Sequence, residues 1–404
     1  KSSEVITNKY REEIDGIRAF AVIAVIINHI NKDFLQSGYL GVDIFFVISG
    51  YVITSSMAAR KSINFQEFIT GFYSRRVKRL IPALVFYVIL MSVAICMVDP
   101  DPQLNLRTGI TSLFGISNLY LIKQSTDYFG QATELNIFTH TWSLAVEEQF
   151  YVLFPILLLI CYKAKFNNFL LIFSLMFLIS LIGSEYFIDT KSVAVFFLSP
   201  FRAWELLAGS ILALGVLPNM NSRLLKEVTA FFGLAAIFFA CFFYSEYTPF
   251  PGLAALIPVL GSAAIIHAGM GGESKILNII KLKPFIFIGL ISYSLYLWHW
   301  PLIVFANYIN PVESFSPIII IFLLALSILI STVSYYIIEQ PFRAKKSFSR
   351  KFIFSSSFVI MFALSVFTIF GIRMEGFQTR FSSEIIAYDK AREPEHIYKP
   401  CDNI

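Results

Sequence analysis

The chain has 404 residues, of which 56% are hydrophobic and 15% are charged, and its mean hydropathy is +0.69. A soluble domain carries roughly 25% charged residues. If this chain were soluble, most of its apolar surface would be in contact with water. We therefore expect an all-α polytopic membrane protein. The net charge of +5 is not gathered into a separate basic domain, so nucleic acid is not an expected partner.

Apolar runs of about 20 residues, the length that crosses a bilayer as a helix, follow one another along the sequence. The run 110–122 is too short and too polar to span, and we expect a re-entrant or surface helix there, within the long loop 99–143. The short run 202–217 has an apolar neighbour, 193–201, that would lengthen it. We expect about eleven membrane-spanning helices, at residues 14–31, 39–57, 80–98, 144–162, 169–187, 202–217, 228–244, 252–268, 284–306, 316–338 and 351–371.

The distribution of basic residues predicts which side each loop occupies. With a cytoplasmic N-terminus, the cytoplasmic segments hold 22 of the 32 Lys and Arg residues, the outer loops hold five, and the segment after residue 371 holds five. Cytoplasmic loops of membrane proteins carry the excess of Lys and Arg. Counting 110–122 as a span would invert every later loop. Eleven spans therefore predict a cytoplasmic N-terminus and an extracytoplasmic C-terminus.

Arg18 and His29 lie eleven residues apart in the first apolar segment, DGIRAFAVIAVIINHI. Eleven residues make close to three helical turns, so we expect both side chains on one helix face, roughly 16 Å apart along the axis. Ionisable groups within a membrane helix are costly and mark candidate functional sites. A cation near one membrane surface and an imidazole near the other suit a long ligand with a charged head and a reactive tail.

The cytoplasmic ends of the predicted helices carry further cations. Arg76 and Arg79 are three residues apart and share a helix face, and guanidinium groups bind phosphate through two parallel hydrogen bonds. We expect Arg18, Arg76 and Arg79 to bind a phosphate-bearing ligand. Arg343 and the lysines near residue 282 are better explained as the basic residues that orient membrane helices.

Acidic, imidazole and aromatic side chains gather near the outer ends of several helices. A histidine beside a carboxylate is a general-base arrangement, because the carboxylate fixes the tautomer and stabilises the imidazolium. We expect His29 to be the catalytic base, with Asp43 or Glu147 as its carboxylate partner. The candidates at this depth are His29, Asp43, His140, Glu147, Glu148, Arg202, Glu205 and His299.

These outer groups also have plainer explanations. Asp43 and Glu147 would serve equally as polar contacts between packed helices. His299 lies in WHWP, which also fits an aromatic belt at the membrane interface. Ser49 has no base evidently placed beside it, so packing explains it better than a nucleophilic role. No metal site is expected, since neither CxxC nor a His-rich spacing occurs.

Seven segments, in order, resemble the membrane acyltransferase type 3 family. They are the Arg18–His29 segment with its R-x10-H spacing, GYLGVDIFFVISGY, RRVKRLIPAL, HTWSLAVEEQFYVLFP, FRAWELLAG, SYSLYLWHWP and EQPFR, from about residue 13 to 343. The resemblance implies transfer of an acyl group, usually acetyl, from cytoplasmic acyl-CoA to a carbohydrate hydroxyl at the outer face of a bacterial inner (cytoplasmic) membrane. The family's essential Arg and His fall on Arg18 and His29, and its R-x-x-R pattern falls on Arg76 and Arg79.

The resemblance extends to an appended outer domain. An eleventh helix followed by a polar segment is similar to family members that carry an SGNH-type domain and modify surface glycans such as lipopolysaccharide O-antigen. We accordingly expect an acyltransferase domain of ten spans at 1–343, an extra transmembrane helix at 344–371, and an extracytoplasmic linker at 372–404 toward such a domain.

Together these readings predict a mechanism. The nucleotide of acetyl-CoA, the co-substrate, would bind Arg18, Arg76 and Arg79, and its arm would reach His29, which takes the proton of the acceptor hydroxyl. Arg202, Glu205 and His299 are expected to contact the carbohydrate acceptor. Membrane lipid is the remaining expected partner. The alternative is a transporter of an anionic or lipid-linked substrate that uses His29 as a proton relay; the two halves lack the matching broken helices that favour it.

Overall fold

The computed structural model describes residues 10–58, 65–126, 135–163, 168–245, 247–272, 274–309, 315–344 and 348–391. Within these ranges the chain forms helices and no strand. The helices are α1 Glu12–Ile30, η1 Gly38–Leu40, α2 Gly41–Ala58, α3 Phe65–Val98, α4 Gln103–Leu113, α5 Ser117–Thr126, α6 Thr141–Lys163, α7 Phe169–Phe187, α8 Ser192–Phe197, α9 Ser199–Ala213, α10 Arg223–Phe243, η3 Leu253–Ala255, α11 Leu256–Met270, α12 Lys275–Ile280, α13 Lys283–Ile309, α14 Pro317–Ser334, the π-helix η4 Tyr335–Glu339, α15 Gln340–Ala344, α16 Arg350–Arg373, η5 Glu375–Arg380 and α17 Ser383–Ala391.

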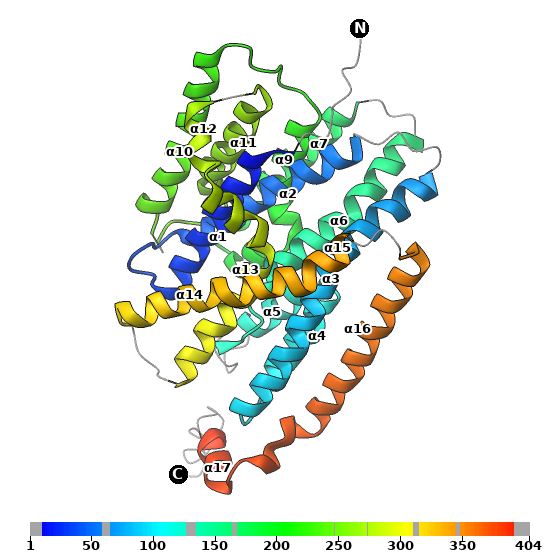
Figure 1. The fold of residues 1–404 in the computed structure, drawn as a ribbon, viewed down its shortest axis with the longest axis vertical. Coiled ribbons are helices and arrows are strands. Elements are labelled where there is room, and N and C mark those ends of the chain that lie inside the picture. Colours follow the sequence, from blue (N-terminus) through cyan, green and yellow to red (C-terminus); the bar gives the residue numbers. More distant parts are fainter. Residues whose placement is uncertain are drawn as a thin grey trace.

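Ten helical segments of the described chain are long and apolar enough to cross a membrane. They coincide with the second to eleventh predicted spans. The first predicted span is α1, whose opening turns hold Glu12, Glu13, Asp15 and Arg18, more charge than a simple hydropathy criterion allows. The all-α polytopic architecture expected from the sequence is thus confirmed (Figure 1).

One predicted segment differs from the observed helices. The run 110–122 falls in two short helices, α4 and α5, with a break at 114–116. The short span 202–217 is lengthened by its apolar neighbour as expected, because α8 and α9 together make an apolar segment from Ser192 to Ala213. The polar segment after residue 371, expected as an extracytoplasmic linker, contains η5 and α17, and its last residues lie outside the described ranges.

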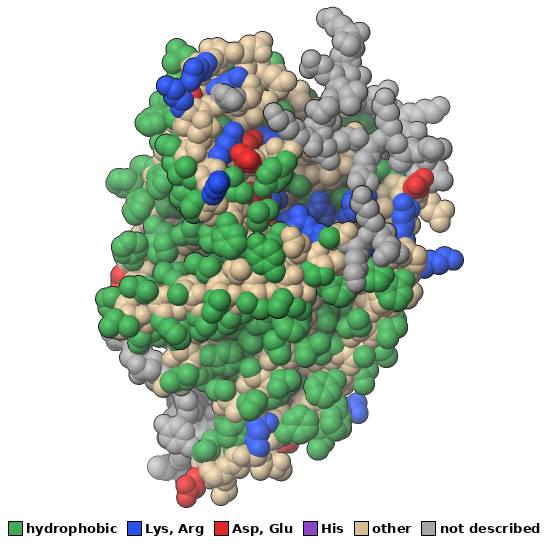
Figure 2. Space-filling model, in the orientation of Figure 1, with side chains coloured by type: hydrophobic (Ala, Val, Ile, Leu, Met, Phe, Trp, Pro, Cys, Tyr) green, Lys and Arg blue, Asp and Glu red, His purple; other side chains and the backbone are tan. Residues whose placement is uncertain are grey.

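α3 is longer than the span predicted within it. Its 34 residues extend about 51 Å at 1.5 Å per residue, whereas the hydrocarbon core of a bilayer is about 30 Å thick. The basic sequence RRVKR therefore lies on a continuous helix that projects beyond the apolar layer. Figure 2 shows hydrophobic side chains over the middle of one face and a group of Lys and Arg side chains in a hollow above them.

Close helix contacts at small residues hold the bundle together. A Cβ atom on Gly50 of α2 would collide with the Leu206 carbonyl of α9, and one on Gly209 of α9 would collide with the Val47 carbonyl of α2. Gly289 of α13 packs in the same way against the backbone of Asp15 in α1. Small residues let membrane helices approach closely. These contacts bring α1, α2, α9 and α13 together around the candidate site, while α16 lies at the edge beside α3 (Figure 1).

Candidate active site

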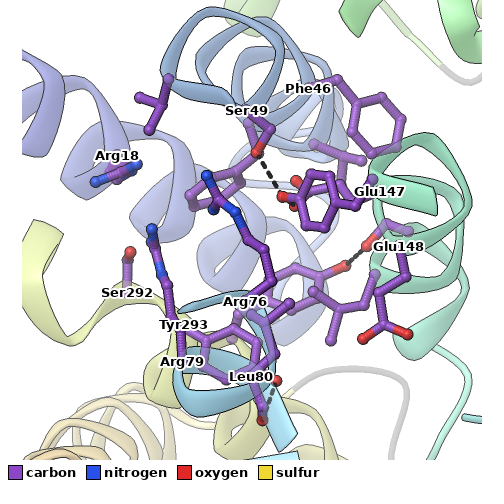
Figure 3. Close-up of a pocket in the computed structure, with 17 residues that line it drawn as sticks. Arg18, Phe46, Ser49, Arg76, Arg79, Leu80, Glu147, Glu148, Ser292 and Tyr293 are labelled. Atoms are coloured by element: carbon purple, nitrogen blue, oxygen red, sulfur yellow. Dashed lines mark hydrogen bonds between the residues drawn. The ribbon is translucent and has the colours of Figure 1, made fainter. Parts of the chain in front are cut away.

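The three arginines expected to bind phosphate line one pocket. Arg18 comes from α1, and Arg76 and Arg79 come from consecutive turns of α3. Figure 3 shows their guanidinium groups directed into the same space, with Glu147 and Glu148 across it on α6. Residues of α2 and α13 complete the wall. The predicted grouping of these cations is therefore present, and two separate stretches of sequence build it.

The charges of this arginine pocket are only partly neutralised by contacts within the described chain. Arg18 forms an ion pair with Asp15 at 2.9 Å. Arg76 lies over the ring of Tyr151, 5.2 Å from its centroid. The buried Nε of Arg79 has no hydrogen-bond partner among the described residues. Because buried cations and donors are costly when unpaired, this arrangement favours an anionic ligand.

Glu147 belongs to the arginine pocket. Tyr151 donates a hydrogen bond of 2.5 Å to the Glu147 carboxylate, and the same hydroxyl is 3.3 Å from Ser49. The expected pairing of Glu147 with His29 is not formed in the described chain. Glu147 lies on α6, seven residues after His140, which directly precedes that helix; this places Glu147 about 10 Å deeper than the outer histidine. Ser49, thought to serve packing, lines the pocket as well.

His29 pairs with another imidazole. Its Nδ1 lies 3.0 Å from Nε2 of His299, and the two rings stack with centroids 5.3 Å apart. Trp300 packs edge-on at 4.7 Å from the His29 ring, and His140 lies 5.6 Å from the His299 ring. Three histidines thus lie together: His29 on α1, His299 on α13 and His140 directly before α6. His299, predicted to contact acceptor, instead contacts the predicted base.

The hydrogen bonds of this imidazole pair define its tautomers when both rings are neutral. Nδ1 of His299 lies 3.1 Å from the Leu295 carbonyl oxygen, which can only accept, so Nδ1 carries the proton. Nε2 of His299 then accepts from Nδ1–H of His29. The remaining nitrogen, Nε2 of His29, consequently keeps an open lone pair, which is what a general base requires.

Asp43 is also placed differently from its prediction. Its carboxylate is completely buried and forms an ion pair of 3.0 Å with Arg202, while Glu205 lies 3.1 Å from the same guanidinium. No hydrogen bond joins Asp43 to His29 in the described chain. The face of α2 that carries Asp43 packs against α9, where Arg202 compensates its charge, and a buried carboxylate needs such a partner.

Arg202 and Glu205, predicted to contact the acceptor, are inaccessible in this structure. Their side chains are 1% and 0% exposed. Four aromatic rings surround the guanidinium at 5.4–5.6 Å: Phe46, Trp142, Phe196 and Phe250. Such cation–π contacts stabilise a desolvated arginine. The two residues therefore belong to a buried charge cluster with Asp43, and direct contact with a ligand would require the aromatic layer to move.

Tyr296 joins the arginine pocket to the histidines, and the sequence alone did not single it out. Its hydroxyl lies 2.6 Å from Ser143 and donates to the His140 carbonyl at 3.0 Å. Its ring centroid is 5.4 Å from that of His140 and 5.5 Å from that of His299. Since Tyr296 and Ser143 also line the arginine pocket, one layer of side chains separates the two groups. The available signal was spacing, because Tyr296 and His299 are three residues apart on α13.

A buried polar network holds the outer end of this arrangement. The Trp300 indole donates to the Asn136 carbonyl at 2.8 Å, and the Asn136 amide donates to Thr108 of α4 at 2.7 Å. Tyr87 of α3 donates to the adjacent Ile137 carbonyl at 2.8 Å. The loop 99–143, where a re-entrant or surface helix is expected from the sequence, therefore anchors Trp300, which packs on His29.

This combination of a multi-pass helical bundle, a pocket lined by three arginines and a histidine cluster is that of a membrane acyltransferase. The family model described as "Acyltransferase domain", of the acyltransferase type 3 family, matches residues 11–337, most of the chain. The chain belongs to this family. The match ends before α16. No solved structure matches the chain.

Relatives of this chain include bacterial O-acetyltransferases. It is 33% identical over 354 residues to the O-acetyltransferase OatA of Staphylococcus aureus (strain NCTC 8325 / PS 47), covering 83% of this chain and 58% of the relative. It is 33% identical over 356 residues to the peptidoglycan O-acetyltransferase OatA of Listeria monocytogenes serovar 1/2a, covering 83% and 56%. It is 32% identical over 365 residues to the putative peptidoglycan O-acetyltransferase YrhL of Bacillus subtilis (strain 168), covering 85% and 57%. The chain thus spans a little over half the length of these relatives.

Proposed function

We propose that this chain transfers an acetyl group from cytoplasmic acetyl-CoA across a bacterial cytoplasmic membrane to a hydroxyl group of an extracytoplasmic polysaccharide. The observation that carries the proposal is the arginine pocket, whose wall at Tyr296 and Ser143 contacts the histidine cluster. Family membership and the names of the relatives support the acetyl-transfer chemistry. The excess of Lys and Arg on one side supports a cytoplasmic position for the pocket.

Arg18, Arg76 and Arg79 hold the phosphates of the donor in this proposal. Guanidinium forks match phosphate oxygens, and the open Nε of Arg79 is a donor without a partner among the described residues. Arg18 and His29 both lie on α1, eleven residues apart, so the separation along its axis is about 16 Å. The pantetheine arm of the donor would cover that distance and bring its thioester toward His29.

His29 is the proposed general base. Its Nε2 takes the proton of the acceptor hydroxyl as the hydroxyl oxygen attacks the thioester carbonyl. The C–S bond then breaks, the ester forms, and the proton passes from the imidazolium to the departing CoA thiolate. His299 holds His29 in the tautomer that leaves Nε2 open, a role that the sequence assigned to Asp43 or Glu147.

The arginine pocket must widen before the donor enters. Its free volume is 60 Å³, which holds a few water molecules and is too small for a pantetheine arm. Tyr296 and Ser143, hydrogen bonded to each other at 2.6 Å, form the wall next to the histidines. We propose that rotation of these side chains opens a passage for the donor. When no donor is bound, the closed wall keeps water and protons from crossing the membrane.

Peptidoglycan is the proposed acceptor. The relatives from Listeria and Bacillus are named as peptidoglycan enzymes, which favours a cell-wall glycan over the lipopolysaccharide O-antigen expected from the family resemblance. Because this chain spans a little over half the length of these relatives, the proposal covers the transfer step at the membrane helices.

The test is acetyl-CoA turnover by purified protein in lipid nanodiscs, comparing wild type with His29→Ala, with and without glycan strands. We expect wild type to release CoA and His29→Ala to bind acetyl-CoA with release reduced by at least about a hundredfold. Wild-type turnover in His29→Ala would refute the assigned base. Movement of an anionic or lipid-linked substrate by wild-type protein without acetyl-CoA consumption would favour the transporter.

A further inference from the structure

A cleft lies at the outer ends of the helices, outside the arginine pocket. Its free volume is 550 Å³, within the range of ligand sites, and its wall includes Tyr39, Asp189, Ser192, Phe196, Tyr247 and Phe250. Tyr39 lies in η1, directly before α2, at the end of the segment that follows His29. The cleft is on the same side as His29, because Ser37, just before Tyr39, donates to the Tyr244 carbonyl at 2.6 Å and Tyr244 ends α10.

The side chains of this outer cleft suit an uncharged sugar chain. Four of them are aromatic, and Tyr247 is 85% exposed, so a ring face is available for stacking on the C–H face of a pyranose. Asp189 and Ser192 offer oxygen atoms to sugar hydroxyl groups. The lining includes a carboxylate and no Lys or Arg among the described residues, which disfavours a phosphate-bearing lipid headgroup or nucleotide.

The floor of the outer cleft rests on the buried charge cluster. The Arg202 guanidinium lies 5.6 Å from the rings of Phe196 and Phe250, and Tyr39 packs edge-on against Phe250 at 4.9 Å. Asp43 and Glu205 hold Arg202 from beneath. The cluster therefore supports the aromatic floor of the cleft.

An aromatic layer connects the outer cleft to the histidine cluster. Trp142 packs with its ring centroid 4.6 Å from that of Phe196 in the cleft. Trp142 follows His140 by two residues, and the His140 ring lies 5.6 Å from that of His299. One buried aromatic layer therefore separates the cleft from the histidine cluster.

We infer that this outer cleft binds the acceptor polysaccharide, an uncharged stretch of glycan chain, and presents it to His29. The inference rests on the proposed function for its link to acetyl transfer, and on the composition of the cleft for the class of ligand. Tyr247 and Phe250 provide the stacking surface, and Asp189 provides a hydrogen-bond acceptor. These residues determine acceptor affinity and do not take part in bond breaking.

The experiment measures acetyl transfer to chitotetraose, a soluble β-1,4-linked N-acetylglucosamine tetramer, by the full chain in nanodiscs. Tyr247→Ala is expected to raise the KM for chitotetraose about three- to tenfold, the effect of one lost stacking contact, and Asp189→Asn about threefold. The kcat at saturating acceptor and the KM for acetyl-CoA should stay unchanged. Tyr186→Ala is the matched control, because Tyr186 is 75% exposed at the outer end of α7 and does not line the cleft.

Direct binding of chitotetraose, measured by calorimetry on the same variants, separates this inference from the proposed function. Weaker binding in Tyr247→Ala, with wild-type binding in Tyr186→Ala, supports the glycan site even if wild type consumes no acetyl-CoA, a result that would count against the acyltransferase proposal alone. An unchanged KM and unchanged binding in the Tyr247→Ala/Asp189→Asn double variant would overturn the glycan site. An equal loss in Tyr186→Ala would do the same, because it would show a general effect of interfacial aromatic residues.

Discussion

His29 Nδ1 lies 3.0 Å from His299 Nε2, and this contact joins α1 to α13 across 270 residues of sequence. The Leu295 carbonyl fixes the proton of His299 on Nδ1. The imidazole pair thereby does for His29 what a carboxylate does in the common histidine–carboxylate arrangement: it orients the ring and selects the tautomer. Unlike a carboxylate, a neutral imidazole adds no negative charge within the membrane.

His299→Ala should lower the kcat for acetyl transfer about a hundredfold, at the lower end of the range for loss of general-base function. The KM for acetyl-CoA should change little, because His299 does not line the arginine pocket. His299→Gln should recover most of the activity, since its amide oxygen can accept from Nδ1–H of His29. Steady-state kinetics on both variants gives the answer. Equal loss in Gln and Ala variants would contradict the tautomer argument.

Arg79→Ala should weaken acetyl-CoA binding about tenfold or more, because a charge-assisted hydrogen bond to phosphate is lost. Binding is measured by isothermal titration calorimetry with desulfo-CoA in nanodiscs, which removes turnover from the readout. Arg350→Ala is the matched control, since Arg350 is 48% exposed and pairs with Glu67 outside the pocket. A comparable loss in the Arg350 variant would mean that general surface charge, and not the pocket, attracts the donor.

Glu147→Gln tests whether Glu147 acts in the arginine pocket, where the structure places it, or as the carboxylate partner of His29, as the sequence suggested. Because Glu147 lies among the arginines and bonds to Tyr151, removing its charge leaves a more positive pocket. The KM for acetyl-CoA should fall about threefold, as for loss of one screened repulsion, with kcat within threefold of wild type. A fall in kcat of more than tenfold, with unchanged KM, would restore Glu147 as the catalytic partner of His29.

The membrane spans, and the depth of each residue along its helix, could be predicted from the sequence because both depend only on position along the chain. The spacing of Arg18 and His29 on one helix, and the approach of Arg76 and Arg79 to Arg18, follow from helical rise and membrane sidedness. The partners of Asp43, Glu147 and His299 depend on which helix face turns toward which neighbour. That rotation is set by contacts such as Gly209 against the Val47 carbonyl, which hydropathy does not encode.

Depth alone would have improved one of these predictions. Seven residues of α6 separate Glu147 from the outer residue His140, about 10 Å of rise. This rise alone places Glu147 nearer to the arginines than to the outer histidines. The pairing of Asp43 with Arg202, by contrast, joins α2 to α9 and has no local signal.

Gly209→Ala tests whether the α2–α9 contact sets this arrangement. The added Cβ would collide with the Val47 backbone carbonyl, and since backbone cannot move aside as a side chain can, the helices must separate. Overpacking of this kind costs about 1–3 kcal/mol, visible as a lower thermal midpoint in detergent. Gly183→Ala is the control, because its Cβ would meet the Phe201 ring at an ordinary 3.5 Å. Equal midpoints for the two variants would contradict the close contact.

Asp43→Ala should destabilise the protein without a specific effect on chemistry. Removing one partner of a buried ion pair costs up to about 3–5 kcal/mol; here Arg202, which is 1% exposed, loses its 3.0 Å contact with Asp43 and keeps Glu205 at 3.1 Å. The amount of monodisperse protein and its thermal midpoint should fall sharply. The triple variant Asp43→Asn/Arg202→Gln/Glu205→Gln, which removes all three charges of the buried cluster, should recover part of the stability, because no charged side chain of the cluster then remains buried. Its kcat per folded molecule, set beside that of wild type, separates the two roles: a kcat within tenfold of wild type fits a structural charge cluster, whereas a well-folded triple variant with a hundredfold lower kcat would mean that Asp43 acts on His29 after all.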